Sequence, residues 1–288
     1  MNFFKKLFGG TDDAADEKQK EESKNFDVLK YDGVKALNSG QAEYAVKCLE
    51  YALTLKDDLE CRDYLSQAYI RQGELAEAYE QLAKMSEACP DNAPILMRMA
   101  DVAYMMENYG AMSDACEKAL LIDADNPLTY YLYARACHGQ GDNTNATAML
   151  TKALTLNAEY DVARLLRGEI YLEENDCANA AHDAALLLER VEGNEDVLLL
   201  NAHVCEAEGK HEEAVDFYGK VIDVNPFCVQ AFSERAAVRR ELGDAAGAEA
   251  DQKEAEELGA NGQQPEESVE QKVKNVYKNN DSFGVFSN

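Results

Sequence analysis

Tryptophan is absent from this sequence of 288 residues, and proline occurs only five times. Alanine is abundant and β-branched residues are few, a mix that favours helix over sheet because alanine loses no side-chain entropy in a helix. Since 46% of the residues are hydrophobic, the chain is able to bury a sizeable core. The composition therefore predicts a mainly helical protein.

Long apolar runs are also missing. No stretch reaches the roughly 18 apolar residues that suggest a transmembrane helix, and the start of the chain lacks the apolar core of a secretory signal. The eight cysteines form no Cys-x-x-Cys pair and no cysteine–histidine cluster with zinc-ligand spacing. We therefore expect reduced thiols, a cytoplasmic location, and neither a metal nor another cofactor.

Positive charge is scarce, because 28 lysines and arginines stand against 55 aspartates and glutamates, for a formal net charge of −27. An acidic surface of this size repels phosphate backbones and disfavours broad docking on anionic membranes, so we expect no nucleic-acid binding. The charge has two interpretations. It keeps an elongated protein soluble, or it attracts basic partner proteins.

Signatures of catalysis are missing as well. The sequence contains no phosphate-binding loop, no dinucleotide-binding glycine motif, no zinc-protease motif and no nucleophile elbow. The four histidines and the scattered carboxylates are better explained as surface residues, and the cysteines as small buried hydrophobic residues, than as catalytic groups. We therefore expect that the protein is not an enzyme.

The chain does contain a regular internal repeat. Turn positions separated by 33 or 34 residues are occupied by Gly40, Gly73, Glu107, Gly141, Asn175, Gly209 and Gly243. They define seven repeats, at 26–58, 59–92, 93–126, 127–160, 161–194, 195–228 and 229–258. Position 8 holds a small residue in every repeat, and alanine recurs at positions 20 and 27, which indicates that two helices cross closely there. Helices of about 12–14 residues are too short to be stable alone, so the repeats must stack.

This pattern resembles the tetratricopeptide repeat family, whose repeats are helix–turn–helix motifs of about 34 residues. The sixth repeat shows the family pattern in Leu198, Ala202, Gly209, Ala214, Tyr218, Val221 and Pro226. The family's tryptophan at position 4 is missing, and Arg62 and Arg164 stand there in repeats two and five. The resemblance implies an all-α fold, a right-handed α-solenoid of helix–turn–helix repeats, that binds other proteins.

The two ends of the chain depart from the repeat. We expect residues 1–25 to be a flexible segment, with a short amphipathic start followed by an acidic linker without apolar periodicity. The amphipathic start, which allows at most weak membrane contact, is formed by Phe3, Phe4, Leu7 and Phe8. We expect residues 259–288 to hold a linker, an extra C-terminal helix near 268–278 that caps the array, and a mobile tail.

The seventh repeat is more polar than the others, with Arg239 and Gln252 at positions where its neighbours are apolar. A final repeat needs a wettable outer face, so this composition is typical of a capping repeat.

In the tetratricopeptide family the first helices line a concave groove, near positions 2, 5, 9 and 12 of each repeat. In repeats three to six these positions hold apolar and aromatic residues rimmed by charge, which is typical of an interaction surface. The candidate groove residues are Met97, Asp101, Tyr104, Tyr131, Arg135, His138, Leu165, Glu169, Leu172, Leu199 and His203. The alternative is that the protein's own tails cover this surface.

We therefore hypothesise a scaffold or adaptor that binds a peptide or a helical segment of another protein in this groove. One specialised role is disfavoured, since family members that clamp the C-terminal carboxylate of chaperones use a set of lysines and asparagines. Here Lys30 is followed by Val34 and Tyr64 instead. The alternative function is a structural module that self-associates through the ends of the array and its tails.

Overall fold

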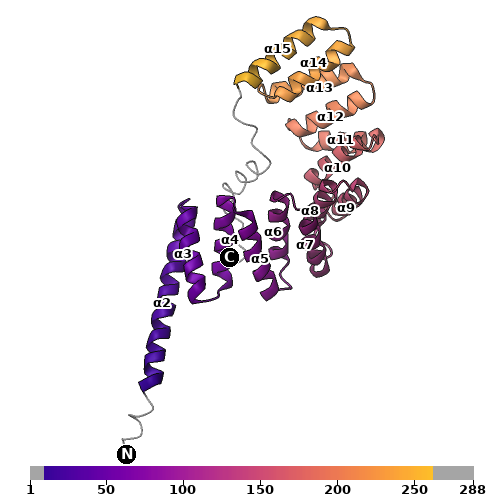
Figure 1. Ribbon diagram of the computed structural model, residues 1–288. Helices are drawn as coiled ribbons and strands as arrows, with labels where there is room; N and C mark the ends of the chain where they lie inside the picture. Colours follow the sequence, from indigo (N-terminus) through magenta and orange to yellow (C-terminus); the bar gives the residue numbers. More distant parts are fainter. Residues whose placement is uncertain (1–9, 262–288) are drawn as a thin grey trace, which may run out of the picture. The chain divides into compact units, whose positions relative to one another are not determined.

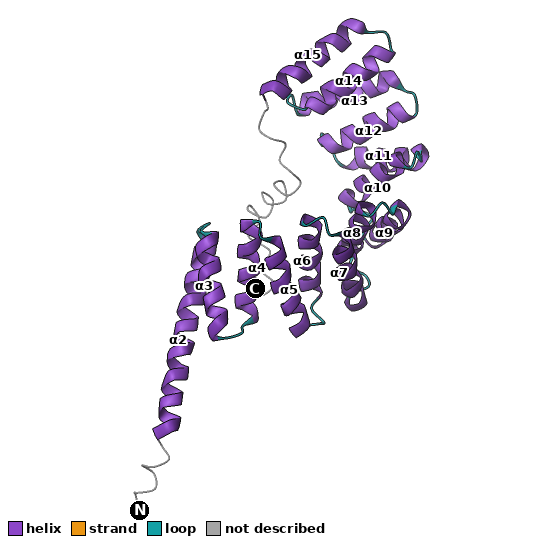
Figure 2. Ribbon diagram, in the orientation of Figure 1, coloured by secondary structure: helices purple, strands orange, loops and turns teal. Residues whose placement is uncertain are grey.

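The computed structural model describes residues 10–261, and all regular structure in that range is α-helix (Figure 2). The described residues contain fourteen helices, which pair into seven helix–turn–helix repeats (Figure 1). This confirms the all-α prediction. The chain divides into two compact parts, an N-terminal half up to residue 122 and a C-terminal half from residue 123, and each is described by itself.

The N-terminal half holds the first three repeats. Its helices are α2 (Gly10–Asn38), α3 (Ala42–Leu55), α4 (Leu59–Gln72), α5 (Leu75–Ala88), α6 (Ala93–Met105) and α7 (Tyr109–Ile122). Each first helix packs against the second helix of its own repeat, and each second helix packs against the first helix of the next repeat.

The C-terminal half holds repeats four to seven and follows the same packing order. Its helices are α8 (Pro127–Gly139), α9 (Asn143–Leu156), α10 (Asp161–Glu173), α11 (Cys177–Arg190), α12 (Glu195–Ala207), α13 (His211–Val224), α14 (Val229–Glu241) and α15 (Ala245–Asn261). From repeat two to repeat seven, every first helix begins at the residue where the sequence predicted that a repeat starts.

The turn within each repeat uses a left-handed residue at the end of the first helix. The five marker glycines have φ between 73° and 83°, and the two residues that replace glycine, Glu107 and Asn175, also have positive φ, at 54° and 58°. A left-handed residue after a helix lets the next backbone N–H groups bond to the last helical carbonyls. The turn geometry is therefore the same in all seven repeats, including the two without glycine.

The first helix is longer than the sequence predicted. α2 begins at Gly10, whereas we expected a flexible linker up to residue 25. Residues 11–25 contain no glycine or proline and are rich in alanine, glutamate and lysine, so extending an existing helix backwards is favourable once its nucleus has formed. At the other end α15 runs to Asn261, so residues 259–261 are helical and do not form a linker.

Two of the predicted end features fall outside the described residues. They are the amphipathic start with Phe3, Phe4, Leu7 and Phe8, and the extra helix and tail after residue 261. Both stay predictions.

Close contact between helices explains the small residues at position 8. A Cβ atom added to Gly33 on α2 would lie 2.6 Å from Cγ of Leu49 on α3, and one added to Gly168 on α10 would lie 2.9 Å from Cδ2 of Leu200 on α12. Both leucines are almost completely buried. The backbones therefore approach too closely for a larger side chain at position 8.

The arginine at position 4 of repeat five, Arg164, belongs to a buried network around Asp183. The Asp183 side chain is 1% exposed and accepts two hydrogen bonds from Arg167, both 2.8 Å long. Arg164 donates to the carbonyl oxygen of Ala158 at 2.8 Å and lies 3.4 Å from Asp183. The aspartate on α11 thus ties two arginines of α10 to the second helix.

Repeat seven has a similar network, with an arginine at position 7 and an aspartate at position 23 as in repeat five, but with its second arginine at position 11 instead of position 4. Arg235 on α14 donates to both carboxylate oxygens of Asp251 on α15, at 2.9 and 2.7 Å. Arg239 adds a third bond to Asp251 at 2.8 Å. Arg239 therefore does not simply form the wettable outer face of a capping repeat, as the sequence suggested, but helps to join the last two helices.

We expect Asp183→Ala to lower the free energy of unfolding by about 3–5 kcal/mol, because it leaves two half-buried guanidinium groups without their carboxylate. Asp216→Ala, at an exposed position on α13, is the control and should change it by less than about 0.5 kcal/mol. Urea unfolding followed by circular dichroism measures both. Equal effects of the two substitutions would contradict a structural role for the buried network.

We expect Gly33→Ala to destabilise the fold by about 1–3 kcal/mol, because the new methyl group meets buried Leu49. This loss opposes the gain of about 1 kcal/mol that alanine normally brings to a helix interior. Gly219→Ala in α13 is the matched control, since its Cβ would find its nearest neighbour at 3.6 Å, an ordinary contact. Gly219→Ala should leave the free energy of unfolding unchanged or raise it in the same experiment. If Gly33→Ala also leaves it unchanged or raises it, close packing at position 8 does not exclude a larger side chain.

Candidate protein-binding surface

The candidate residues lie on the first helices of repeats three to six. Ten of them are half-buried and Glu169 is exposed, so none of the eleven is fully buried in the core. They are Met97, Asp101 and Tyr104 on α6, Tyr131, Arg135 and His138 on α8, Leu165, Glu169 and Leu172 on α10, and Leu199 and His203 on α12. α6 belongs to the N-terminal half and the other three helices to the C-terminal half, so the set is described in two parts.

On α6, the candidate residues lie next to the turn of repeat three. The ring of Tyr104 stands 6.2 Å from the ring of Tyr109, which begins α7, in a tilted arrangement. Asp101 lies one turn and Met97 two turns before Tyr104 on the same side of the helix. This part offers one aromatic side chain, one thioether and one carboxylate.

On α8, an aromatic contact joins the first helix of repeat four to the end of the same repeat. The ring of Tyr131 lies 5.4 Å from the ring of Tyr160, which precedes α10, and the guanidinium carbon of Arg135 lies 5.6 Å from the centre of the Tyr131 ring. One turn further on, His138 places its Nδ1 atom 2.9 Å from Oδ1 of Asn143. These contacts hold the α8 residues in defined orientations.

The leucines on α10 and α12 are only partly available to a ligand. Leu165 and Leu172 pack against a core cluster that includes Leu187 and Leu200. Leu199 packs in the same way against the core cluster around Tyr218. Their outer sides reach solvent while their inner sides belong to the protein's own interior, so the apolar stripe is narrower than the sequence suggested.

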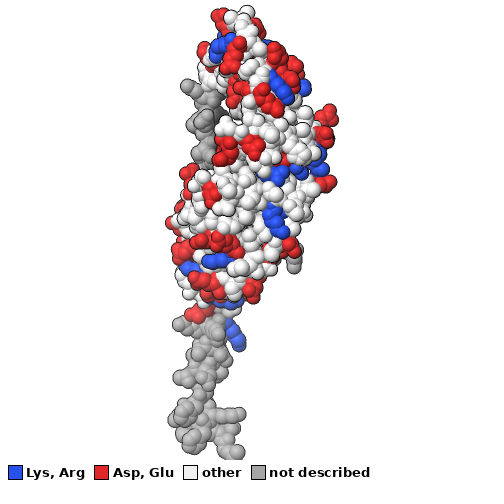
Figure 3. Space-filling model, turned by 90° about the vertical axis from the view of Figure 1, so that its right-hand side faces the viewer, with Lys and Arg blue, Asp and Glu red and all other residues white. Residues whose placement is uncertain are grey.

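Carboxylates surround these leucines. Reduced hydration by the surrounding protein raises the pKa of Glu169, although its side chain reaches solvent, and the charges of Asp196 and Glu173 raise it further. His138 and His203 act in the opposite direction. Charged groups on α8, α10 and α12 therefore all act on Glu169. The face drawn in Figure 3 likewise carries more acidic than basic side chains.

His203 is held by an ion pair across repeats six and seven. Its Nε2 atom lies 2.8 Å from Oε2 of Glu234 on α14. This hydrogen bond raises the pKa of His203, outweighing its partial burial. Burial acts to raise the pKa of Glu234, but the hydrogen bonds from His203 and Gln230 and the charge of His203 together lower it. The sequence pattern gave no sign of this partner.

Some groove positions behave differently from the family pattern. Asp63, at position 5 of repeat two, is only 2% exposed and forms an ion pair with Arg98 on α6. Arg98 also donates to the hydroxyl of Ser66 at 2.8 Å. Conversely, Leu128 and Val162 at position 2 of repeats four and five are 41% and 49% exposed, more than the leucines in the candidate set. Leu128 and Val162 were not among the candidate residues, although position 2 is one of the groove positions of the family pattern and could have identified them from the sequence.

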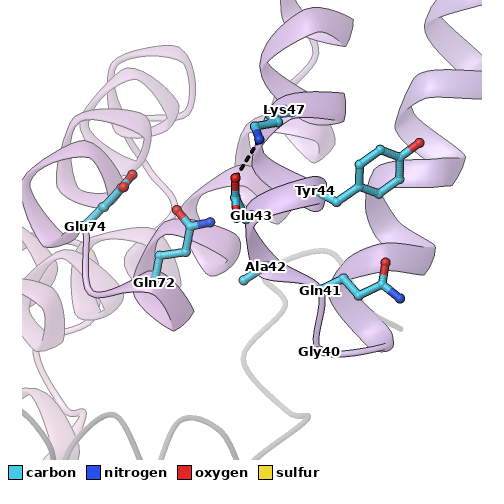
Figure 4. A pocket seen from close by; sticks show the side chains of 8 residues that line it. All are labelled: Gly40, Gln41, Ala42, Glu43, Tyr44, Lys47, Gln72 and Glu74. Atoms are coloured by element: carbon cyan, nitrogen blue, oxygen red, sulfur yellow. Dashed lines mark hydrogen bonds and ion pairs between the residues drawn. The ribbon is translucent and has the colours of Figure 1, made fainter.

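The structure also contains a pocket of about 760 Å³ that we did not anticipate from the sequence (Figure 4). It lies between the turns of repeats one and two and is lined by Gly40, Gln41, Ala42, Glu43, Tyr44, Lys47, Gln72 and Glu74. Lys47 and Glu43 neutralise each other through an ion pair of 2.6 Å. The lining consists mainly of turn residues and helix ends, which define no ligand class.

Within residues 10–261, no group of three or more histidine, cysteine or acidic side chains is arranged to hold a metal ion. No helix in this range combines the length and the apolarity needed to cross a bilayer. All eight cysteines are free thiols.

The repeat geometry can now be compared with known proteins. Family models described as tetratricopeptide repeat match residues 59–102, 128–160 and 196–228. The chain is a tetratricopeptide repeat protein. The matches fall in both halves, on repeats two, four and six, and the other repeats share their helix lengths and turn geometry.

Solved structures of other tetratricopeptide repeat proteins share the fold at low sequence identity. A protein from Parabacteroides merdae has a TM-score of 0.68 at 16% identity, over 89% of this chain and 100% of that chain. MamA from Desulfovibrio magneticus has a TM-score of 0.57 at 14% identity, over 60% and 98%. YrrB, described as having an unusual peptide-binding site, has a TM-score of 0.52 at 17% identity, over 68% and 97%. These likenesses show the fold alone.

One curated protein is similar in sequence to part of the chain. Cellulose synthase operon protein C of Pseudomonas fluorescens is 32% identical over 92 residues, which is 32% of this chain and 7% of that protein. The chain thus spans only a small share of this relative's length, and the similarity concerns a stretch equivalent to fewer than three repeats.

We expect the His203–Glu234 pair to stabilise the fold between about pH 4.3 and 6.5, the ordinary pKa values of the two groups. The contribution of His203, whose folded pKa is raised, is complete below about pH 6.5 and is lost as the pH rises through that folded value. The contribution of Glu234, whose folded pKa is lowered, is complete above about pH 4.3 and is lost as the pH falls through its folded value.

An NMR titration of the His203 ring measures this coupling. Its midpoint should fall when Glu234→Gln removes the negative partner, and the stability difference between wild type and variant should shrink above neutral pH. The same midpoint in both proteins would show that the pair does not form in solution.

Proposed function

We propose that this tetratricopeptide repeat protein is a scaffold or adaptor that binds a segment of another protein on the first-helix face of α8, α10 and α12. The observation that carries the proposal is the contrast between positions on these helices. Positions 3, 8 and 10 are buried in all three, whereas positions 5, 9 and 12 stay accessible wherever the candidate set includes them. Side chains that are not buried between the stacked helices remain available for contact with a partner protein.

The chemistry of this face defines the partner segment. Leu165, Leu172 and Leu199 offer the outer sides of apolar side chains, and Glu169 lies among further carboxylates that raise its pKa. A cationic side chain placed there would relieve the mutual repulsion of the carboxylates, which gives both attraction and selectivity. We therefore expect an extended or helical segment that alternates apolar residues with lysine or arginine.

A known structure supports this proposal. YrrB, which shares the fold, is described as having an unusual peptide-binding site, and a peptide is the kind of ligand proposed here. The free cysteines fit a reducing compartment, so we propose a cytoplasmic location.

The residues Met97, Asp101 and Tyr104 extend the proposed surface by analogy, because they occupy the equivalent positions on α6. They belong to the N-terminal half, so the proposal treats them as a separate contact site for the same kind of segment.

The test uses an array of peptides in which the spacing of leucine and lysine is varied systematically, followed by fluorescence anisotropy with the best binders. We expect Glu169→Lys to weaken binding at least tenfold, about 1.4 kcal/mol, because it replaces attraction by repulsion of the basic side chain. Glu189→Lys makes the same change at an exposed position on the second helix α11 and should leave the affinity within about twofold.

The far-ultraviolet circular dichroism of both variants should match wild type, since neither glutamate is in the core. Equal loss of binding in both variants would mean that only the overall charge matters. No loss in either would rule out the face of α8, α10 and α12.

A further inference from the structure

The first helix of repeat five begins without the polar cap that most other first helices have. An asparagine or aspartate stands immediately before four of the first helices, and its side chain accepts a hydrogen bond from a backbone N–H of the first turn; these caps are Asp58, Asn92, Asn126 and Asn194. Tyr160 occupies the same place before α10, and its side chain makes no such bond. Because asparagine and aspartate stabilise a helix from this place, repeat five gives up a favourable local interaction for a tyrosine.

The ring of Tyr160 contributes instead to an apolar surface at the starts of α8 and α10. It lies 5.4 Å from the ring of Tyr131 on α8. Leu128, one turn before Tyr131, is 41% exposed, and Val162, two residues after Tyr160, is 49% exposed. We call Leu128, Tyr131, Tyr160 and Val162 the α8–α10 patch.

The two exposed side chains of this patch are unusual for their place in the repeat. Leu128 and Val162 occupy position 2, which is polar in repeats one, two, six and seven, with Asp27, Glu60, Asp196 and Gln230. The stacking of repeats therefore does not require an apolar residue at position 2. Departures from the local rules that specify a fold are expected at functional sites, and three of the four patch residues are such departures.

The charges around the patch balance one another, although the whole chain has a net charge of −27. Glu159 and Asp161 stand on either side of Tyr160 in the sequence, and Arg190 on α11 lies 3.6 Å from the first carboxylate and 2.9 Å from the second. The guanidinium carbon of Arg135 lies 5.6 Å from the centre of the Tyr131 ring. Two arginines thus offset two carboxylates, so an apolar side chain can dock here without desolvating an unpaired charge.

The acidic part of the binding face begins two turns further along α10. Val162 and Glu169 are seven residues apart, so they lie on the same side of the helix and about 10 Å from each other along its axis. The charges of Glu173 and Asp196 act on Glu169 as well. One face therefore combines a charge-balanced apolar patch with a carboxylate at a defined distance, and a segment with an apolar and a basic side chain at that distance is complementary to both.

We propose that the α8–α10 patch is the anchor site of the binding face and takes a large apolar side chain, such as leucine, from a segment of a partner protein. A lysine or arginine about 10 Å from this anchor pairs with Glu169. The inference rests on the function proposed above and adds to it the place where the partner is anchored. A buried apolar anchor in a pocket typically contributes more to affinity than the polar contacts around it.

Fluorescence anisotropy with the tightest-binding leucine–lysine peptide of the array tests the anchor site. Val162→Asp should weaken binding at least tenfold, because the peptide leucine would meet a charged group. Aspartate is native to the same position in repeat six, so α10 should still fold. Since an added carboxylate attracts a basic peptide, a loss of affinity cannot come from the overall charge.

Val224→Asp is the matched control, because Val224 is also 49% exposed and ends α13 in repeat six. It should leave the affinity within about twofold of wild type. An equal loss in Val162→Asp and Val224→Asp, or no loss in either, would overturn the anchor site.

Tyr160→Asn separates binding from stability. It introduces the cap residue found before α6, α8 and α12, so the circular dichroism should match wild type, while the affinity for the peptide should fall at least tenfold. Unchanged affinity would show that Tyr160 serves the fold alone and would remove it from the anchor site.

A second peptide, in which the leucine is replaced by alanine, locates the contact. Val162→Asp should change the affinity of this peptide by less than about twofold, because the group that it opposes is gone. Equal effects of Val162→Asp on both peptides would mean that the leucine binds elsewhere. Binding that responds to Glu169→Lys but to neither patch variant would overturn the anchor site and leave the proposed function standing. Binding that responds to the patch variants but not to Glu169→Lys would support the anchor site and contradict the acidic contact of the proposed function.

Two other occupants of the patch are distinguished in the same experiments. If the chain's own start held the patch, deletion of residues 1–9 would raise the affinity for the peptide. If a second copy held it, light scattering would show a mass that grows with concentration and that Val162→Asp returns to 31.9 kDa. Either result would overturn the assignment to a separate partner protein.

Discussion

The close packing of neighbouring helices, both within a repeat and between successive repeats, is the constraint on which the rest of this structure depends. At Gly33 and Gly168 the backbones approach so closely that one added carbon would collide with a buried leucine. Close crossing fixes which side of each helix is buried, because a helix that presents small residues to its neighbour must turn its other sides outward. The repeat length of about 34 residues and the accessible first-helix face both follow from it.

This constraint explains why so much of the fold was predictable. Small residues at fixed positions and a turn residue at constant spacing are visible in sequence, so six first helices begin where expected. Even Glu107 and Asn175 adopt the left-handed turn conformation that their places in the register require. The start of α2 was not predictable in this way, since residues 11–25 have helix-forming composition but no apolar periodicity to reveal a helix.

The polar interior was harder to foresee. Arg164 and Arg167 converge on Asp183 from a different helix, and nothing local in the sequence shows that these side chains meet. With the structure in hand a signal is visible, because repeats five and seven share arginine at position 7 and aspartate at position 23. Asp63 follows the same logic, since its burial depends on Arg98 in the next repeat. The half-buried state of the candidate leucines likewise depends on neighbours that the repeat pattern leaves variable.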